Sequence, residues 1–250
     1  MNLFRSLVFS AIFAGGLVGV LASAMHLAVT VPLILQAETF EKLESAGNVP
    51  AHEHSGAQVH SHEPVKAAES GEIEFGRNAF TVIAMILAYI GFALLLNVSA
   101  EMTGGFGDVK AGSGWGVAGF LVFSLVPALG LPPELPGMPA ADLFSRQAWW
   151  IATVACTAGS LWLASSTKFG WRWPIAAIVV TLPFGYGAPH PLDSISEVPA
   201  SLHFQFVVST LLVSFVSWQI LGVSLGWLRS RSWNDTAGRE DASARRTTAR

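Results

Sequence analysis

The stretch AFTVIAMILAYIGFALLLNV, residues 79–98, decides the fold, because 20 residues follow one another without a charged side chain. A helix rises about 1.5 Å per residue, so about 20 apolar residues cross the roughly 30 Å hydrocarbon core of a membrane. The apolar residues are continuous and do not alternate with polar ones as in a membrane-spanning β-strand. This stretch is therefore predicted to be a transmembrane helix.

The composition of the whole chain agrees with this prediction. Of the 250 residues, 52% are hydrophobic and 12% are charged, and the mean hydropathy is +0.50. A soluble domain carries about 25% charged residues, so a purely soluble protein is excluded. The formal net charge is -3 and no cluster of Lys and Arg is interleaved with aromatic residues, so nucleic acid is not an expected partner. The single cysteine, Cys156, excludes an internal disulfide.

Five more charge-poor stretches of similar length indicate an all-α integral membrane protein, a bundle of about six transmembrane helices. The predicted spans lie near residues 7–35, 79–98, 114–131, 148–165, 173–188 and 204–228. They form one transmembrane domain, residues 1–228, and the basic tail 229–250 is expected to be disordered. The external loop 38–78 is polar and acidic, with too few large apolar residues to fold alone.

The N-terminal span has a second interpretation. Arg5, the apolar run after it and the sequence Ala22-Ser23-Ala24 also match a cleaved secretory signal. Apolar residues continue to Leu35, which is long for a signal sequence and favours a retained anchor. Cleavage would leave five spans and would move no other loop across the membrane.

Lys and Arg are shared unequally between the two sets of loops. If the N-terminus is cytoplasmic, ten of the 14 basic residues lie on the inner side and twelve of the 17 acidic residues on the outer side. The positive-inside rule then places both termini in the cytoplasm and the loop 38–78 outside.

All seven histidines fall on the predicted outer side, four of them as two H-x-H pairs in the external loop. In an extended chain, residues i and i+2 point the same way, so each pair can present two imidazoles to one ion. Imidazole with carboxylate suits Co, Ni, Zn and Cu(II), and affinity alone does not favour cobalt. The candidate metal ligands are His52, His54, His60 and His62 in the loop, and His26, His190, His203, Glu38 and Glu134 near the outer ends of spans.

Each of these residues also has an interpretation without a metal. The loop histidines suit a solvated or pH-sensitive polar segment equally. His26 suits an interfacial imidazole that hydrogen-bonds to a neighbouring helix, and His190 and His203 suit structural roles beside a short connection. Most carboxylates in loops are simply solvated.

Proline and glycine interrupt two of the predicted spans. The sequence LGLPPELPG, residues 129–137, cannot continue a helix because proline lacks the amide donor. The span 173–188 contains Pro174 and Pro183. A broken backbone at membrane depth is tolerated where it is buried or lines a cavity, and interrupted spans mark transport sites. Two ordinary proline-rich turns are the alternative, and Glu134 is the acid within the first motif.

Small residues repeat at every fourth position of two spans, which allows helices to approach closely. The two stripes are Ala11, Gly15, Gly19 and Ser23 in the first span, and Gly222 and Gly226 in the last. Packing within the bundle is favoured over a dimer interface. The chain has no Walker P-loop, nucleotide fingerprint or H-E-x-x-H motif, and no nucleophile with a base in a recognisable pattern, so an enzyme is not expected.

Several of these segments together resemble the CbtA family, predicted cobalt transporter subunits of bacteria. They are VPLILQAETFE (31–41), GLPPELPG (130–137), RQAWW (146–150), GAPHP (187–191) and LGVSLGW (221–227). The resemblance implies a protein of the bacterial inner membrane that works with a small CbtB-type single-helix subunit and is tied to cobalamin supply. The H-x(4)-D-H motif of nickel/cobalt permeases is absent.

These observations predict uptake of a divalent transition metal, with Co(II) favoured over Ni, Zn or Cu, and with no cofactor required. The loop would capture the ion on the periplasmic side and pass it to a site near His26, Glu38, Glu134, His190 and His203. The alternative is a membrane subunit that binds or senses the metal, or delivers it to a partner, without transporting it.

Overall fold

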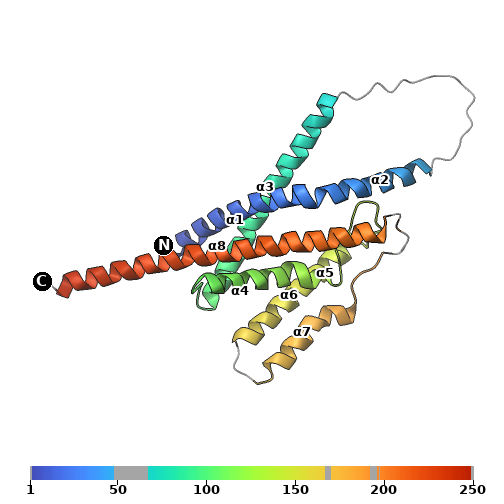
Figure 1. Ribbon diagram of the computed structural model, residues 1–250. Coiled ribbons are helices and arrows are strands. Elements are labelled where there is room, and N and C mark those ends of the chain that lie inside the picture. The colour runs from blue at the N-terminus through green and yellow to red at the C-terminus, as the bar shows by residue number, and fades with distance from the viewer. Residues whose placement is uncertain (1, 48–66, 167–169, 192–195, 197, 249–250) are drawn as a thin grey trace, which may run out of the picture.

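The computed structural model describes residues 2–47, 67–166, 170–191, 196 and 198–248, and within them the chain is helical without a strand. The elements are α1 (Asn2–Val29), α2 (Val31–Gly47), α3 (Ala67–Met102), α4 (Val109–Phe120), the π-helical turn η1 (Leu121–Leu125), α5 (Val126–Ala128), α6 (Leu143–Ser166), α7 (Arg172–Tyr186) and α8 (Ala200–Thr248). Figure 1 shows α8 crossing the centre of the molecule, with α1 and α2 on one side, the α6–α7 hairpin on the other, and α3 running past α8 from one side to the other.

Five of the described helices are long and apolar enough to cross a membrane. They are Leu3–Val29, Asn78–Met102, Val109–Ala128, Leu143–Ser165 and Ala200–Arg231. These spans confirm the prediction of an all-α membrane protein with about six helices. The predicted span 173–188 corresponds to α7, whose 15 residues extend only about 22 Å. It is shorter than the hydrocarbon core, unlike the other five.

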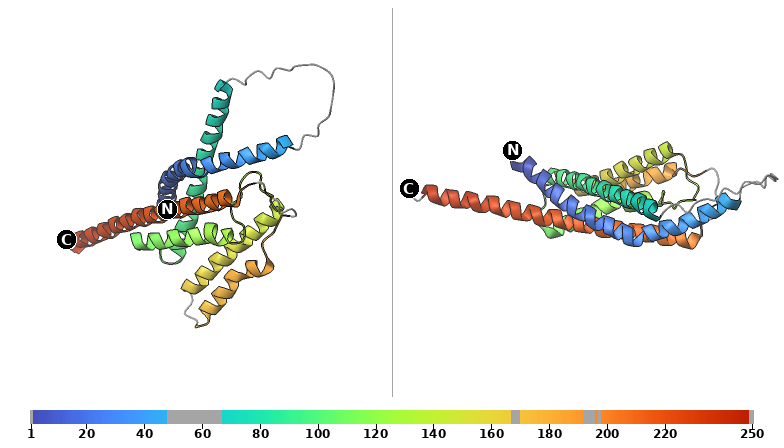
Figure 2. Two further views of the ribbon diagram at one scale, coloured as in Figure 1. Left: turned by 45° about the vertical axis from the view of Figure 1, so that its right-hand side comes forward. Right: turned by 90° about the horizontal axis from the view of Figure 1, so that it is seen from above.

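The first span ends earlier than its composition suggests. Residues 7–35 were predicted to form one helix, but the chain bends after Val29 and continues as α2 (Figure 2). Pro32 has no amide proton, so the regular bonding pattern is interrupted. The amides of Leu33 and Ile34 instead donate to the Thr30 carbonyl, both at 3.1 Å.

Two segments expected to be irregular are partly helical. The external loop 38–78 begins as the end of α2 and finishes as the start of α3, and α8 continues through residues 229–248 of the expected disordered tail. The start of α3 and the end of α8 are extensions of a membrane helix, which removes the cost of starting a new one. The loop histidines at 52, 54, 60 and 62 lie outside the described residues.

Both small-residue stripes pack inside the bundle, as predicted. A Cβ atom on Gly15 would lie 2.5 Å from the Cα of Ile90, and one on Gly19 would lie 2.5 Å from the Cα of Ile86 on α3. A Cβ on Gly222 of α8 would overlap the Gly112 carbonyl of α4. Backbones at this separation exclude any larger side chain and make many van der Waals contacts.

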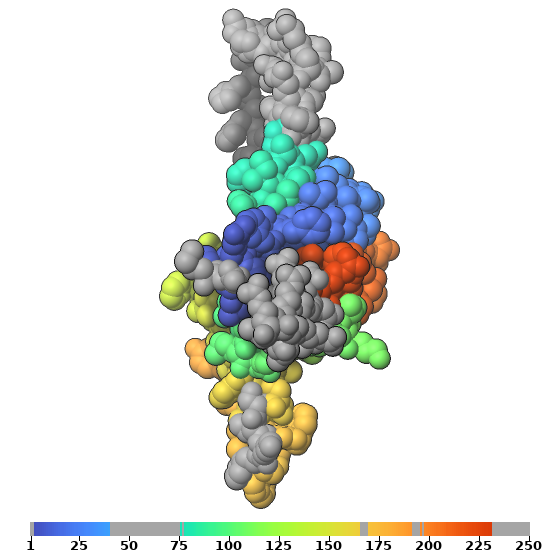
Figure 3. Space-filling view, turned by 90° about the vertical axis from the view of Figure 1, so that its left-hand side faces the viewer, coloured from blue at the N-terminus to red at the C-terminus, as the bar shows by residue number. Residues whose placement is uncertain are grey.

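The helices are arranged as a flattened stack rather than a closed bundle. The space-filling view shows the coloured part of α3 toward one end of a long outline and α6 and α7 toward the other (Figure 3). Large apolar side chains such as Phe80, Leu95 and Ile151 are more than half exposed. Side chains of this kind are expected on a surface that faces lipid.

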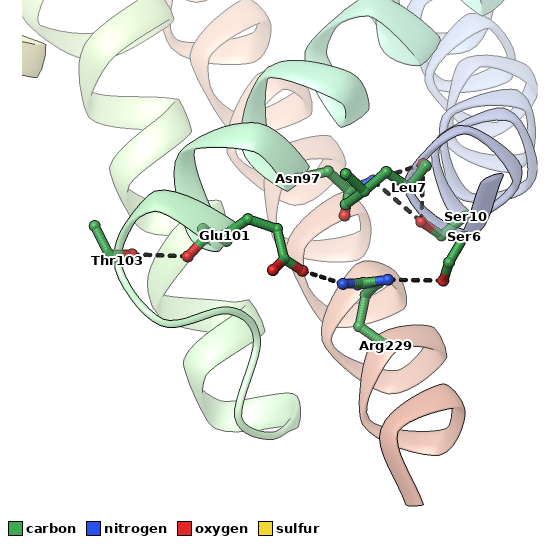
Figure 4. A network of polar contacts seen from close by, with 8 residues as sticks. Ser6, Leu7, Ser10, Asn97, Glu101, Thr103 and Arg229 are labelled. Atoms are coloured by element: carbon green, nitrogen blue, oxygen red, sulfur yellow. Dashed lines mark hydrogen bonds and ion pairs between the residues drawn. The ribbon is translucent and has the colours of Figure 1, made fainter. Parts of the chain in front are cut away.

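A polar network joins three helices at the end of the bundle that contains the start of α1 (Figure 4). Arg229 of α8 donates to the Ser6 hydroxyl of α1 at 2.7 Å and forms an ion pair with Glu101 of α3. Asn97 of α3 donates to the Leu7 carbonyl at 3.1 Å. We call this end of the molecule the inner end, after the side of the membrane that the charge distribution predicts for it, and the opposite one the outer end.

Candidate functional site

The predicted ligands do not form a preassembled metal centre. Within the residues that the structure describes, no group of three or more His, Cys, Asp or Glu side chains is placed to hold an ion. The four loop histidines lie outside those residues. The remaining five candidates occupy three separate surroundings: His26 at the end of α1, Glu38, Glu134 and His203 around one apolar cluster, and His190 beside a cavity.

His26 is bonded within its own chain segment. Its Nδ1 atom lies 3.0 Å from the Thr30 hydroxyl, and that hydroxyl donates its proton to the His26 carbonyl at 3.0 Å. A threonine hydroxyl carries one proton, so Nδ1 is the donor to Thr30 and Nε2 is the nitrogen with a lone pair. The predicted bond to a neighbouring helix is replaced by a bond across the α1–α2 bend.

Three predicted ligands flank buried residues of one apolar cluster, which we call the outer cluster. The cluster consists of Ala37, Leu135, Val198, Leu202 and Phe206, with Leu33, Ile34, Phe40 and Met138 packed against it. Glu38 follows Ala37, Glu134 precedes Leu135, and His203 follows Leu202. The cluster therefore brings α2, the broken segment after α5 and the start of α8 together, and the three predicted ligands are next in sequence to its residues.

His203 connects α8 to the broken segment directly. Its Nε2 atom lies 3.0 Å from the Pro133 carbonyl oxygen. A carbonyl only accepts, so Nε2 carries the proton and Nδ1 has the free lone pair. The imidazole thus has a structural bond on one side and a possible metal ligand atom on the other.

Glu134 is held by an arginine that sequence analysis had counted only as a charge. The Arg146 Nη2 atom of α6 lies 3.0 Å from Glu134 Oε2, and the two side chains are 30% and 23% exposed. Glu134 is therefore not a free carboxylate in this conformation. The nearest signal in the sequence was the position of Arg146 at the head of the RQAWW segment, one turn into a membrane helix.

The broken segment lines a cavity of about 590 Å³ between η1, α6 and α8. Its lining residues are Phe123, Ser124, Pro127, Ala128, Leu131, Pro132, Pro133, Leu143, Arg146, Gln147, Trp150, Ile151, Thr210, Leu211 and Ser214. Arg146 is the one charged side chain among them. A π-helical turn inside a span often marks a functional site, and the cavity agrees with the prediction for broken backbone at membrane depth.

Hydroxyl groups form the polar part of this cavity. The Ser124 and Ser214 oxygens lie 2.7 Å apart, and the Trp218 indole donates to Ser124 at 3.3 Å. The Thr210 hydroxyl is buried and has no hydrogen-bond partner among the described residues. The rest of the cavity wall is mostly apolar, so Ser124 and Ser214 form a small polar patch within it.

Trp149 connects the proline-rich segment to α7. Its indole ring lies against Gly130, where any Cβ atom would overlap it. Its Nε1 atom donates to the Pro183 carbonyl of α7 at 3.0 Å. The proline-rich segment, the RQAWW segment and the proline of α7 therefore form one packed unit.

His190 lies in a different place from Glu134 and His203. It is exposed and lines a second cavity of about 500 Å³ together with Asp142 and Ser145. The Ser145 amide and hydroxyl donate to the Asp142 carboxylate at 2.9 and 3.0 Å. These bonds hold the pKa of Asp142 below its ordinary value. The structure thus separates the predicted outer site into two.

Comparison with known proteins adds one match. The sequence model of the family described as CbtA, probable cobalt transporter subunit, matches residues 4–230 of the chain. No curated protein and no solved structure matches it.

Proposed function

The chain belongs to the CbtA family of probable cobalt transporter subunits, and from this premise we propose that it takes up Co(II) across the bacterial inner membrane to supply cobalamin synthesis. The metal is the cargo, and no catalytic step is proposed. His52, His54, His60 and His62 would concentrate the ion on the periplasmic side, and Glu38, Glu134 and His203 would receive it at the outer cluster.

One observation carries this proposal. Glu38, Glu134 and His203 come from three distant parts of the chain, and each is next in sequence to a buried residue of the outer cluster. Pro132 and Pro133, just before Glu134, line the larger cavity together with Ser124 and Ser214. A carboxylate and an imidazole suit borderline divalent ions. The hydroxyls of Ser124 and Ser214 would provide neutral oxygen atoms for an ion that retains part of its hydration shell.

The proposed orientation has support at the inner end. Ser6, Glu101 and Arg229 meet there, so the first residues of the chain and the end of the last span lie on the same side. The charge distribution favours the cytoplasm for that side. A small CbtB-type single-helix subunit is the proposed partner, and the family description itself names a subunit.

Reconstitution in liposomes tests the function. The purified protein would be inserted into vesicles that contain a metal-sensitive dye, and Co(II) would be added outside with and without a proton gradient. The Glu134→Gln/His203→Gln variant should abolish dye quenching. The Asp142→Asn/His190→Gln variant alters the second cavity and serves as the matched comparison. Wild-type rates in both variants would show that neither the outer cluster nor the second cavity lies on the transport route.

A second candidate function is binding and delivery without transport. It is favoured by the family description, which names a transporter subunit. Metal entry into vesicles by the isolated chain would exclude it. Metal binding without entry, followed by entry once a partner subunit is added, would support it.

A further inference from the structure

The larger cavity is bordered by side chains that face lipid. On its α6 side, the lining residues Leu143 and Ile151 are 66% and 61% exposed. Leu129, which follows the lining residue Ala128, is 70% exposed. Large apolar side chains with this exposure lie against hydrocarbon in a membrane protein. Along this border, acyl chains rather than water are therefore next to the cavity.

The wall of the cavity suits an acyl chain. It is mostly apolar and includes Phe123 of η1, Trp150 of α6 and Leu211 of α8. Its volume of about 590 Å³ lies within the range of about 300–1,000 Å³ that is typical of sites for organic ligands. The hydroxyls of Ser124 and Ser214 bond to each other, and an apolar guest leaves that bond intact.

Two opposite charges lie at the edge of the cavity near the start of α6. Arg146 lines the cavity, and Glu134 directly follows the lining residue Pro133. The membrane-spanning part of α6 begins at Leu143, so Arg146 is one turn from the end of a span. Charged and aromatic residues at the ends of spans lie at the level of the phospholipid headgroups.

Both charged groups can form further bonds while they remain paired. Arg146 makes one contact, from Nη2 to Oε2 of Glu134 at 3.0 Å. A guanidinium group has five N–H donors and matches the oxygens of a phosphate group. Oε1 of Glu134 forms no ion pair among the described residues, and the side chain is 23% exposed. The pair therefore offers donors to an anion and an acceptor to a cation, side by side.

We propose that the larger cavity binds one phospholipid of the surrounding bilayer, and that the Arg146–Glu134 pair selects an ethanolamine headgroup. An acyl chain occupies the apolar part of the cavity, the phosphate accepts from Arg146, and the ammonium group donates to Glu134 when no metal ion is bound there. A choline headgroup has no N–H to donate, and a glycerol headgroup has no cation for the carboxylate. This lipid site goes beyond the proposed uptake function and does not depend on it.

Native mass spectrometry of the full-length protein tests the site. The protein would be purified in detergent and depleted of lipid, and no Co(II) would be present. Phosphatidylethanolamine, phosphatidylcholine and phosphatidylglycerol with identical acyl chains would be added separately, and the dissociation constant of the first bound lipid measured. The ethanolamine lipid should bind about ten-fold more tightly than the other two, as expected for one additional charge-assisted hydrogen bond.

Four variants locate the lipid. Arg146→Gln should weaken binding of the ethanolamine lipid about ten-fold, whereas Arg146→Lys keeps a cation for the phosphate and should retain most of the binding. Glu134→Gln should abolish the preference for ethanolamine over choline. Ala128→Phe fills the cavity and should weaken binding of all three lipids. The matched control is Arg172→Gln, at the opposite end of the α6–α7 hairpin, which should leave the constants unchanged.

Several results would overturn the proposal. Equal constants for the ethanolamine and choline lipids in the unaltered protein would remove headgroup selection by the pair. Unchanged binding in Arg146→Gln or in Ala128→Phe would place the lipid elsewhere on the protein. If none of the three lipids binds, the cavity is left for another occupant, such as a partner helix. Because metal is absent throughout, none of these outcomes depends on whether the protein transports Co(II).

Discussion

Replacing Arg229 with methionine should destabilise the protein strongly, because this side chain joins three helices at the inner end. It donates to Ser6 of α1 and is paired with Glu101 of α3, and the Arg229 and Glu101 side chains are only 12% and 28% exposed. Removing one partner of a fully buried pair costs about 3–5 kcal/mol. Glu101 keeps some contact with solvent, so we expect a loss of about 2–3 kcal/mol in the free energy of unfolding.

Thermal unfolding of the purified protein in detergent, followed by tryptophan fluorescence, measures this loss. For a chain of this size, about 1 kcal/mol corresponds to roughly 2–4 °C, so Arg229→Met should lower the Tm by about 5–10 °C. Glu101→Gln should cost less, because Arg229 keeps its bond to Ser6. Arg5→Met is the matched control. The Arg5 side chain is exposed, and its guanidinium group lies 5.6 Å from the Phe9 ring centre.

The double variant Glu101→Gln/Arg229→Met decides whether the two residues act as a pair. Coupled residues give a combined cost smaller than the sum of the single costs. Two results would refute the reasoning. The first is a Tm of Arg229→Met within about 1 °C of wild type, which is well below the shift expected for ~1 kcal/mol. The second is a double variant whose cost equals the sum of the two single costs.

Three further outcomes are expected from the same unfolding assay. Gly222→Ala should lower the Tm sharply, because its Cβ atom would overlap the backbone of α4, whereas Gly91→Ala meets open space and should be neutral or stabilising. Asp142→Asn should destabilise slightly at neutral pH, because a neutral amide oxygen accepts the two Ser145 bonds less strongly than the carboxylate does. The pKa of Asp142 is lowered by folding, so this difference is complete above the ordinary value of 3.8 and disappears as the pH falls through the lowered pKa. Trp149→Phe keeps a ring against the neighbouring glycine but loses the bond to α7, and it should cost about 1 kcal/mol.

The positions of the spans and the class of fold followed from sequence because both depend on local composition. Apolar length sets whether a helix can cross the bilayer, and this rule found five spanning helices together with the shorter α7. The same rule failed at Pro32, where an interruption of backbone bonding counts more than hydropathy. Sequence analysis counted Arg146 only as a charge that indicates topology. Its pairing with Glu134 depends on how two distant segments pack, which no local rule describes.

The candidate site was only partly accessible to sequence reasoning. The pattern of histidines and carboxylates made Glu38, Glu134 and His203 candidate ligands, which stays a prediction, and only the contacts of Ala37, Leu135 and Leu202 showed that their segments meet at one cluster. No local rule predicts that His190 lies beside a separate cavity. No sequence pattern indicated which hydroxyls would line the larger cavity, since serine and threonine are common in membrane helices and most of them bond to their own backbone.

Local chemistry determined that the chain crosses a membrane, where it breaks, and which side chains were capable of binding a metal. Tertiary packing alone decided which of those side chains already have a partner. Glu134 is paired with Arg146, and one nitrogen of His203 is bonded to the Pro133 carbonyl. Packing also left the buried hydroxyl of Thr210 without a hydrogen-bond partner among the described residues. The physical reason is that hydropathy and propensity act over one helix turn, whereas hydrogen bonds and ion pairs between helices depend on contacts between residues up to 223 positions apart in sequence.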